Sequence, residues 1–237
     1  MSTASPVTLI TGGSSGIGAA AARSLLERGH RVAVTGRSEE RLARFAAEAK
    51  EIAEPERLLT FAGDAAENGD VEAAVDGTVE AFGRLDHAVA NAGFATPGTL
   101  ADGDPDRWRE MVLTNVLGPA LLVRAALPAL RESRGRIVLV GSVAGMIHTP
   151  GNLYGATKWA VTGLAENIRL LVTGEDIGVT LVAPGRVETP FWEHSGRVPE
   201  GNLLTADQLA DALVWSLTQP PNVDVNTLTI RPIGQPV

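Results

Sequence analysis

The chain has 237 residues, of which 44% are hydrophobic and 20% charged, and its formal net charge is −8. This composition is typical of a globular protein with a buried core, and the acidity argues against a nucleic-acid or anionic-membrane partner. Because cysteine is absent, disulfides, thiolate zinc sites, Cys-ligated iron–sulfur clusters and cysteine nucleophiles are excluded. The length fits one α/β domain and is too short for two large ones.

Short β-branched and apolar runs alternate with longer helical segments along the chain. Strands are predicted at residues 7–11, 31–35, 57–62, 85–90, 136–140, 179–182 and 226–230. Helices are predicted at 16–28, 39–50, 67–82, 106–131, 153–172 and 205–217, two of them with N-caps at Ser38 and Thr205. This alternation predicts an α/β fold, namely a doubly wound, Rossmann-type parallel sheet of about seven strands with helices on both faces.

No uninterrupted apolar run approaches the roughly 18 residues of a membrane span, and the most apolar long segment, 120–130, contains Arg124 and Pro128. The N-terminal stretch before the first strand has no basic region ahead of an apolar core, so it does not resemble a signal peptide. We therefore expect a soluble, cytoplasmic protein without a membrane partner.

The predicted topology indicates where chemistry should occur, because ligands of open α/β sheets bind outside the carboxyl ends of the strands. Three stretches at this edge, 94–105, 143–153 and 184–204, are read as active-site loops rather than linkers. Neither a composition shift nor an internal repeat divides the chain. Residues 1–237 are therefore expected to form a single catalytic domain.

A glycine-rich turn follows the first predicted strand, with the sequence Thr-Gly-Gly-Ser-Ser-Gly-Ile-Gly at residues 11–18. Glycines permit a tight turn and let the backbone approach a pyrophosphate, and the following helix N-terminus supplies N–H donors. The spacing differs from the G-x-G-x-x-G of other dinucleotide folds. In its strand–turn–helix context, it predicts nucleotide binding.

Tyrosine and lysine are rare in this chain. Tyr154 is the only tyrosine, and it stands four residues before Lys158, one of only two lysines. On a helix this spacing places both side chains on one face. A nearby ammonium favours the phenolate, so Lys158 is predicted to lower the pKa of Tyr154 from its ordinary value of about 10.

Taken in order, residues 11–18, Asn91-Ala92-Gly93, Ser142, Tyr154-x-x-x-Lys158 and Pro184-Gly185 resemble the classical short-chain dehydrogenase/reductase family. The resemblance covers essentially the whole chain and implies hydride transfer between a nicotinamide cofactor and a carbonyl or secondary alcohol. The ending at residues 224–232 is similar to the branch that contains NADP-dependent 3-hydroxy-acid (serine-type) dehydrogenases and clavulanaldehyde-type reductases.

The resemblance assigns catalytic roles to four residues. Tyr154 is the general acid in reduction and the base in oxidation, while Ser142 hydrogen-bonds the developing alkoxide. Lys158 tunes Tyr154 and holds the nicotinamide ribose, and Asn115 positions a water in the proton relay. As an alternative, Asn115 is a polar residue that bends the helix.

The residue after the second strand indicates which cofactor is used. An NAD enzyme usually has a carboxylate there for the ribose 2′-hydroxyl, whereas this chain has Gly36 followed by Arg37, whose guanidinium suits a 2′-phosphate. We therefore expect NADP(H), with Asp64 near the adenine or, alternatively, serving as a helix N-cap. The predicted cofactor residues are Gly12, Ser14, Ser15, Gly16, Ile17, Gly18, Arg37, Asp64, Ala65, Asn91, Ala92, Gly93, Tyr154, Lys158, Pro184, Gly185, Val187 and Thr189.

The predicted substrate pocket is largely apolar, which favours a small to medium hydrophobic ketone or aldehyde. Its predicted residues are Ser142, Val143, Met146, His148, Leu153, Tyr154, Phe191 and Trp192, with Phe94 beside them. Arg186 and Glu188 are expected to pair with each other in solvent or, alternatively, to contact the substrate. The four histidines are scattered without metal-ligand spacing, so no metal site is predicted.

The sequence also predicts that the protein assembles into an oligomer, and it leaves two alternative functions open. Apolar residues on more than one face of the helix at 153–172, together with the family resemblance, predict a homo-oligomer that pairs this helix and the one around 115–131. The expected assembly is a tetramer, with a dimer as the alternative. A catalytically silent dinucleotide-binding regulator is the alternative function, although it would be expected to lack an intact Ser/Tyr/Lys set. A nucleotide-sugar epimerase or dehydratase shares the Tyr-x-x-x-Lys pair but usually needs a larger C-terminal region.

Overall fold

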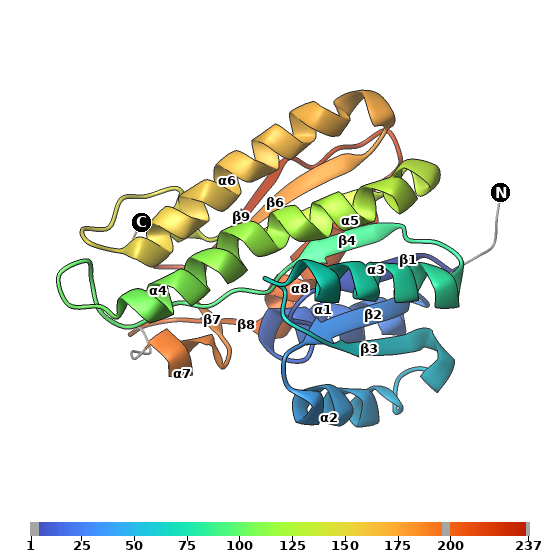
Figure 1. Cartoon of the computed structure of the whole chain (residues 1–237), viewed down its shortest axis with the longest axis horizontal. Coiled ribbons are helices and arrows are strands. Elements are labelled where there is room, and N and C mark those ends of the chain that lie inside the picture. The colour runs from blue at the N-terminus through green and yellow to red at the C-terminus, as the bar shows by residue number, and fades with distance from the viewer. Residues whose placement is uncertain (1–4, 196–199, 236–237) are drawn as a thin grey trace.

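Seven strands form the main sheet of the computed structural model, which describes residues 5–195 and 200–235 (Figure 1). In spatial order they are β3 (Leu58–Ala62), β2 (Arg31–Gly36), β1 (Val7–Ile10), β4 (His87–Ala90), β5 (Arg136–Val140), β6 (Gly178–Pro184) and β9 (Thr227–Ile230). Every neighbouring pair is parallel, so the predicted doubly wound sheet is confirmed. The strand order reverses between β1 and β4, which is the switch point where ligands bind in such sheets.

Helices cover both faces of this sheet. One core contains residues of α3 (Asn68–Phe82), α5 (Gly118–Ser133) and α6 (Leu153–Val172), which cross the same face (Figure 1). A second core contains residues of α1 (Gly16–Glu27), α2 (Glu39–Ala49) and α8 (Ala206–Leu217). Strand residues are buried almost without interruption, as expected for a parallel sheet covered on both sides.

Both predicted helix caps are present. The Ser38 hydroxyl accepts the Arg41 N–H at 3.2 Å at the start of α2. Thr205 accepts the Gln208 N–H at 3.1 Å, and the Gln208 side chain accepts the Thr205 N–H at 3.0 Å, which completes a capping box before α8. These local signals depend only on residues a few positions apart, which explains why the sequence predicted them correctly.

The predicted helix at 106–131 is one continuous helix with a change of winding in its middle. It consists of α4 (Pro105–Val112), a π-helical turn at Leu113–Leu117, and α5. Over Pro105–Ser133 it is long and apolar enough to cross a membrane by length and composition alone, although Arg124 and Pro128 interrupt its most apolar stretch. Core helices pass the same test, and the inner side of α5 is buried against the sheet.

The predicted loop at 184–204 contains short elements that the sequence did not indicate. These are β7 (Val187–Glu188), β8 (Leu204–Thr205) and α7 (Phe191–Ser195). β7 and β8 pair in parallel as a separate two-stranded sheet. This pairing brings the chain back to the edge of the main sheet where β6 ends, and it holds the loop at that edge.

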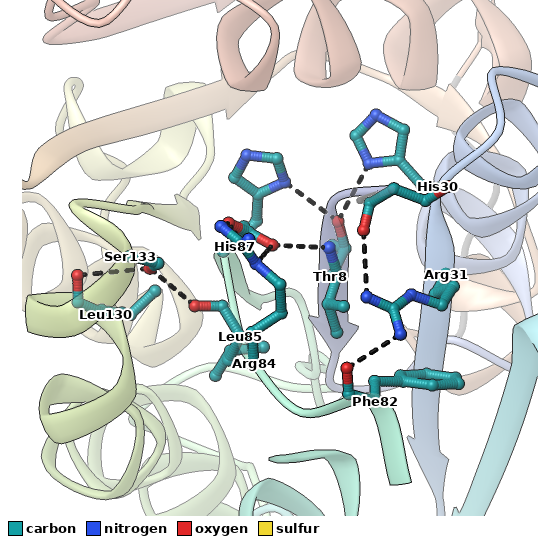
Figure 2. A network of polar contacts seen from close by, with 12 residues as sticks. Thr8, His30, Arg31, Phe82, Arg84, Leu85, His87, Leu130 and Ser133 are labelled. Carbon is teal, nitrogen blue, oxygen red and sulfur yellow. Dashed lines mark hydrogen bonds and ion pairs between the residues drawn. The ribbon is translucent and has the colours of Figure 1, made fainter. Parts of the chain in front are cut away.

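At the amino end of the sheet, two buried histidines share one hydroxyl group (Figure 2). The Thr8 Oγ1 atom lies 3.0 Å from the Nδ1 atom of His87 and 3.5 Å from that of His30. Burial lowers the pKa of both imidazoles, that of His87 to about 3. Beside them, Arg84 forms a bidentate ion pair with Asp86, whose carboxylate also accepts the Val7 N–H at 2.8 Å.

Candidate active site

An open cleft of about 1430 Å³ lies at the edge where the strands of the main sheet end. Most of the residues predicted from the sequence line it. They are Gly12, Ser14, Ser15, Gly16, Ile17, Arg37, Asp64, Ala65, Asn91, Ala92, Gly93, Ser142, Val143, Tyr154, Lys158, Pro184, Gly185, Val187, Thr189, Phe191 and Trp192, with Phe94 beside them. The structure therefore brings together side chains from the ends of six strands.

The glycine-rich loop leaves its helix N-terminus open toward this cleft. Gly12 and Gly16 both have positive φ angles, of 65° and 53°, a conformation that glycine adopts without strain. Ser15 makes no side-chain cap bond, and the first turn of α1 contains no acidic residue. The free N–H groups and the positive end of the helix dipole are therefore available to an anion.

Gly18, a predicted cofactor residue, does not line the cleft. A Cβ atom at this position would lie 2.5 Å from both the Asn91 side-chain amide and the Gly12 carbonyl oxygen. The glycine is thus required for close packing of α1 against the loop rather than for contact with a ligand.

Asn91 braces the glycine loop from the end of β4. Its side-chain amide donates to the carbonyl oxygens of Thr11 at 2.9 Å and Gly12 at 3.1 Å. In return, the Thr11 hydroxyl accepts the main-chain N–H groups of Asn91 and Ala92. These contacts fix the two sides of the switch point relative to each other.

The residue after β2 is the cation Arg37, and no carboxylate is present at Gly36 or Arg37. A Cβ atom on Gly36 would lie 2.8 Å from the Ser14 hydroxyl oxygen, so a larger residue fits there only if the Ser14 side chain moves. The Arg37 guanidinium lies over the Phe94 ring, 5.9 Å from its centroid, and Arg107 of α4 approaches the same ring at 5.6 Å. Asp64 lines the cleft beside β3, and its carboxylate accepts the Ala66 N–H at 2.9 Å instead of capping α3, whose N-cap is Glu67.

Ser142, Tyr154 and Lys158 meet in the cleft. Ser142 follows β5 and caps a 3₁₀ turn by accepting the Ala144 N–H at 3.1 Å. Tyr154 lies in the first turn of α6, and Lys158 lies one turn later with its Nζ atom 5.8 Å from the centre of the Tyr154 ring. Lys158 is buried, and its ammonium donates to the Val140 carbonyl oxygen at 2.8 Å.

The acidity of this group differs from the sequence prediction. Burial raises the pKa of Tyr154 to about 12, and a hydrogen bond with Ser142 only partly opposes this. Burial also lowers the pKa of Lys158 to about 8. The predicted lowering of the Tyr154 pKa by Lys158 is therefore wrong, because desolvation of the phenolate outweighs the effect of an ammonium that is turned toward Val140.

Asn115 occupies the π-helical turn but does not line the cleft. Its amide donates to the Phe94 carbonyl oxygen at 2.9 Å and accepts the Phe94 N–H at 3.0 Å, and it also donates to the Thr157 hydroxyl at 3.0 Å. Asn115 thus ties the loop after β4 to α6, one residue before Lys158. Its predicted role in a proton relay stays a prediction.

Aromatic side chains form the wall beside Tyr154. The Phe191 ring lies 5.5 Å from that of Tyr154 and packs edge-on against Trp192, whose indole N–H donates to the Val187 carbonyl oxygen at 2.7 Å. The apolar wall predicted for a substrate is therefore present at the positions of Phe191 and Trp192, next to Val143.

Three residues predicted for substrate binding lie outside this cleft. Met146 packs against the core beneath α3, α5 and α6, and its sulfur lies 3.6 Å from the Thr229 hydroxyl oxygen. His148 is exposed and stacks on Trp159, with ring centroids 5.3 Å apart. Leu153 precedes Tyr154 on α6, and neighbouring residues of a helix point about 100° apart. Because of the turn after Ser142 and the pitch of α6, these side chains lie away from the cleft.

The expected pairing of Arg186 with Glu188 is also absent. Arg186 lines the cleft, and its guanidinium donates to the main-chain carbonyl oxygen of Glu200 at 2.5 Å. Among the cleft-lining residues that sequence reasoning missed are Arg41, Arg107 and Gln235, the last of which lies far away in sequence. Among the His, Asp and Glu side chains that the structure describes, no cluster could hold a metal ion.

Fold and site together define the class of a nicotinamide-dependent oxidoreductase with a Rossmann-type sheet. A family model described as short chain dehydrogenase matches residues 6–198. The chain therefore belongs to the short-chain dehydrogenase/reductase family, which confirms the resemblance found in the sequence.

Similar proteins span nearly the whole chain. An uncharacterized oxidoreductase of Staphylococcus epidermidis is 33% identical and covers 96% of this chain and 97% of its own length. An alcohol dehydrogenase from Thermococcus sibiricus complexed with 5-hydroxy-NADP is 30% identical, with a TM-score of 0.89 and 98% of each chain covered. A 3-ketoacyl-(acyl-carrier-protein) reductase from Brucella melitensis complexed with NADH is 28% identical, with a TM-score of 0.87, 97% of this chain covered and 98% of that chain. These relatives are oxidoreductases, and the two solved structures contain an NADP derivative in one case and NADH in the other.

Proposed function

We propose that this protein is an NADP(H)-dependent oxidoreductase that interconverts a carbonyl group and a secondary alcohol. The observation that carries the proposal is the meeting of Ser142, Tyr154 and Lys158 in one cleft with the open N-terminus of α1. In this proposal, Ser142, Tyr154, Lys158 and Asn115 act in catalysis or its support.

The residues of the cleft fit a nicotinamide dinucleotide. The glycine loop lines the cleft from Gly12 to Ile17, and the N-terminus of α1, which no side chain caps, would bind the pyrophosphate. Ala65 and Asn91 to Gly93 would contact the adenosine side, whereas Lys158 and the loop from Pro184 to Thr189 would hold the nicotinamide side. When bound, the nicotinamide supplies or accepts the hydride.

The preference for NADP(H) rests on the end of β2. Arg37 and Arg41 line the cleft there, while Gly36 cannot accept from a ribose 2′-hydroxyl. A guanidinium and a 2′-phosphate form charge-assisted hydrogen bonds, which are stronger than neutral ones. This arrangement supports NADPH over NADH.

Tyr154 is suited to donate a proton during carbonyl reduction. Because burial raises its pKa to about 12, the phenol is protonated at neutral pH. It would protonate the carbonyl oxygen as the hydride arrives, while the Ser142 hydroxyl stabilises the developing negative charge. Lys158 would hold its proton near neutral pH despite burial, because its pKa remains at about 8.

The aromatic wall supports a hydrophobic substrate. Phe191 lies beside the proposed proton donor and packs against Trp192, and Val143 lines the same cleft. We propose a small to medium ketone or aldehyde that packs its apolar portion against these rings.

A panel of ketones and aldehydes with NADPH and NADH, followed by the absorbance of the reduced nicotinamide, tests this function. Turnover of at least one carbonyl compound with NADPH is expected. A protein that binds NADPH but reduces none of them would favour the alternative of a silent regulator. A matched Tyr154→Phe sample identifies turnover that does not depend on the site.

We also propose that the active form is a homotetramer in the cytoplasm, with residues 1–237 acting as one domain. Exposed apolar side chains lie along α4, the π turn and α6, where Leu113 and Leu117 are 39% and 41% exposed and Trp159 is 40% exposed. An isologous partner would cover such a face. Light scattering after gel filtration should find about four times the chain mass of 24.7 kDa. A dominant monomer at micromolar concentration would contradict this assembly.

A further inference from the structure

The last described residues of the chain return to the cleft. After β9 ends at Ile230, the side of the cleft near Pro184 and Gly185 is lined by Ile233, Gly234 and Gln235. None of these three residues is assigned a role by the motifs that follow the other strands.

A tight turn directs Gln235 toward the loop after β6. The Gln235 N–H donates to the Pro232 carbonyl oxygen at 3.1 Å, and Gly234 has a φ angle of 86°. A positive φ at the third position of a four-residue turn is typical of type II and requires glycine or asparagine there. Because Ile233 is 92% exposed, burial of its side chain does not hold this turn in place.

Polar contacts hold the turn against the cleft loop instead. The Gln235 Oε1 atom accepts the main-chain N–H of Arg186 at 2.9 Å. The Asn202 side-chain amide donates to the Ile233 carbonyl oxygen at 3.3 Å. On the other side of Arg186, its carbonyl oxygen accepts the Leu204 N–H at 2.9 Å. Arg186 is therefore fixed through both of its main-chain polar groups.

The contact between Gln235 and Arg186 requires a residue without a side chain at Gly185. A Cβ atom at position 185 would collide with the Gln235 Oε1 atom and would lie 3.1 Å from the Arg231 Cα atom. The Gly185 N–H donates to the Ile230 carbonyl oxygen at 2.7 Å, so this residue continues the pairing of β6 with β9. Beyond it the main sheet ends, and the only regular pairing is the two-residue ladder of β7 with β8.

We infer that Gln235 is a positioning residue, which holds the main chain from Gly185 to Thr189 in the conformation that binds the cofactor. This inference rests on the proposed function, in which that loop contacts the nicotinamide side of NADP(H). Without the Gln235 side chain, the Arg186 N–H loses its protein acceptor just where the loop leaves the sheet. The loop then has other conformations available, and cofactor binding must select one of them.

The test compares two substitutions at one position in the full-length protein. Gln235→Leu removes the acceptor at similar size, whereas Gln235→Glu keeps a carboxyl oxygen that can accept the Arg186 N–H. Titration calorimetry with NADPH should give a Kd about five- to tenfold weaker for the leucine variant, the effect of one lost hydrogen bond. The glutamate variant should stay within about twofold of wild type, and both should keep a Tm within about 4 °C of wild type, since one part-buried hydrogen bond contributes little to stability.

Gln219 provides a matched control at the opposite end of the sheet. Its side-chain amide donates to the Trp215 carbonyl oxygen at 2.8 Å, far from the cleft-lining residues. Gln219→Leu is therefore expected to leave the Kd of NADPH unchanged.

Three outcomes would overturn the inference. Equal NADPH affinity of wild type and the leucine variant would reject Gln235 alone and leave the proposed function intact. Equal losses in the leucine and glutamate variants, accompanied by a lower Tm, would reduce Gln235 to a structural residue. A wild-type protein that binds neither NADPH nor NADH would reject the proposed function and this inference together.

Discussion

Arginines at the two ends of the sheet use their hydrogen-bond donors in opposite ways. At the amino end, Arg31 donates to the Phe82 carbonyl oxygen, where α3 ends, and Arg136 donates to the main chain beyond α8. Arg57 likewise binds the carbonyl oxygen of His30, just after α1. The Phe82 carbonyl is one of those that a helix leaves unpaired at its C-terminus, and the other acceptors lie in the main chain just beyond α1 and α8.

At the carboxyl end the guanidinium groups retain free donors. Within the described residues, Arg37 and Arg41 make no side-chain hydrogen bond, and Arg107 and Arg186 make one each. The same residue type thus stabilises helix ends at one edge and remains available to an anionic ligand at the other. The comparison shows that position in the sheet, not residue type, determines whether these arginines bond to the main chain or keep free donors.

The largest expected effect at the cleft end is that of Tyr154→Phe. Removing the hydroxyl should lower kcat about 10²- to 10⁴-fold, the usual effect of losing a general acid. The Kd of NADPH, measured by calorimetry, and the Tm should both stay near wild type, because the ring still packs on Phe191. A phenylalanine variant with near wild-type kcat would show that Tyr154 is not the proton donor.

A pair of arginines on one strand sharpens the comparison. Arg37→Ala, at the end of β2, should raise the KM for NADPH about ten- to hundredfold and barely change that for NADH, since one charge-assisted phosphate contact is lost. Arg31→Ala, at the start of the same strand, should instead lower the free energy of unfolding by about 1–3 kcal/mol, because it leaves the Phe82 carbonyl oxygen unpaired.

Two measurements distinguish these variants. Initial rates with NADPH and NADH give the cofactor preference, and urea denaturation gives the free energy of unfolding. Equal use of NADPH and NADH by the wild-type protein would reject the role of Arg37. A change of cofactor preference in the Arg31 variant would contradict the expectation that arginines at the amino end of the sheet affect stability and not cofactor binding.

The smallest effect is a pH dependence that arises at the amino end. Folded His87 takes up a proton only near pH 3, whereas the unfolded chain does so near 6.5. As the pH falls below 6.5, the unfolded state binds more protons, so the free energy of unfolding should fall by about 1.4 kcal/mol per pH unit through this group. His30, whose pKa is lowered mainly by burial, acts in the same direction.

Buried groups of the cleft do not contribute in this range. Lys158, with its pKa lowered to about 8, is largely protonated in both states at pH 7 and below, and Tyr154 is neutral in both. Urea denaturation at about pH 7 and pH 5 therefore reports mainly on the histidines. His87→Asn should give a shallower pH dependence than wild type, and an unchanged slope would exclude His87 as its source.

Local sequence determined the regular elements and the glycine loop. The caps at Ser38 and Thr205 use partners three residues away, and the spacing of Tyr154 and Lys158 alone places them on one helix face. Such patterns depend on neighbours within one or two helical turns, so they can be recognised in the sequence without knowledge of the rest of the fold. The alternation of strands and helices then fixed the edge of the sheet at which the cleft lies.

Tertiary structure decided what depends on residues distant in sequence. Asn115 contacts Phe94 across 21 positions, and Gln235 contacts Arg186 across 49, although neither position carries a local signal for its partner. Burial, a property of the whole fold, raised the pKa of Tyr154 although its nearest cationic neighbour in sequence predicted the opposite. Packing determines which polar groups lose water and which partners they find, and no short stretch of sequence contains that information.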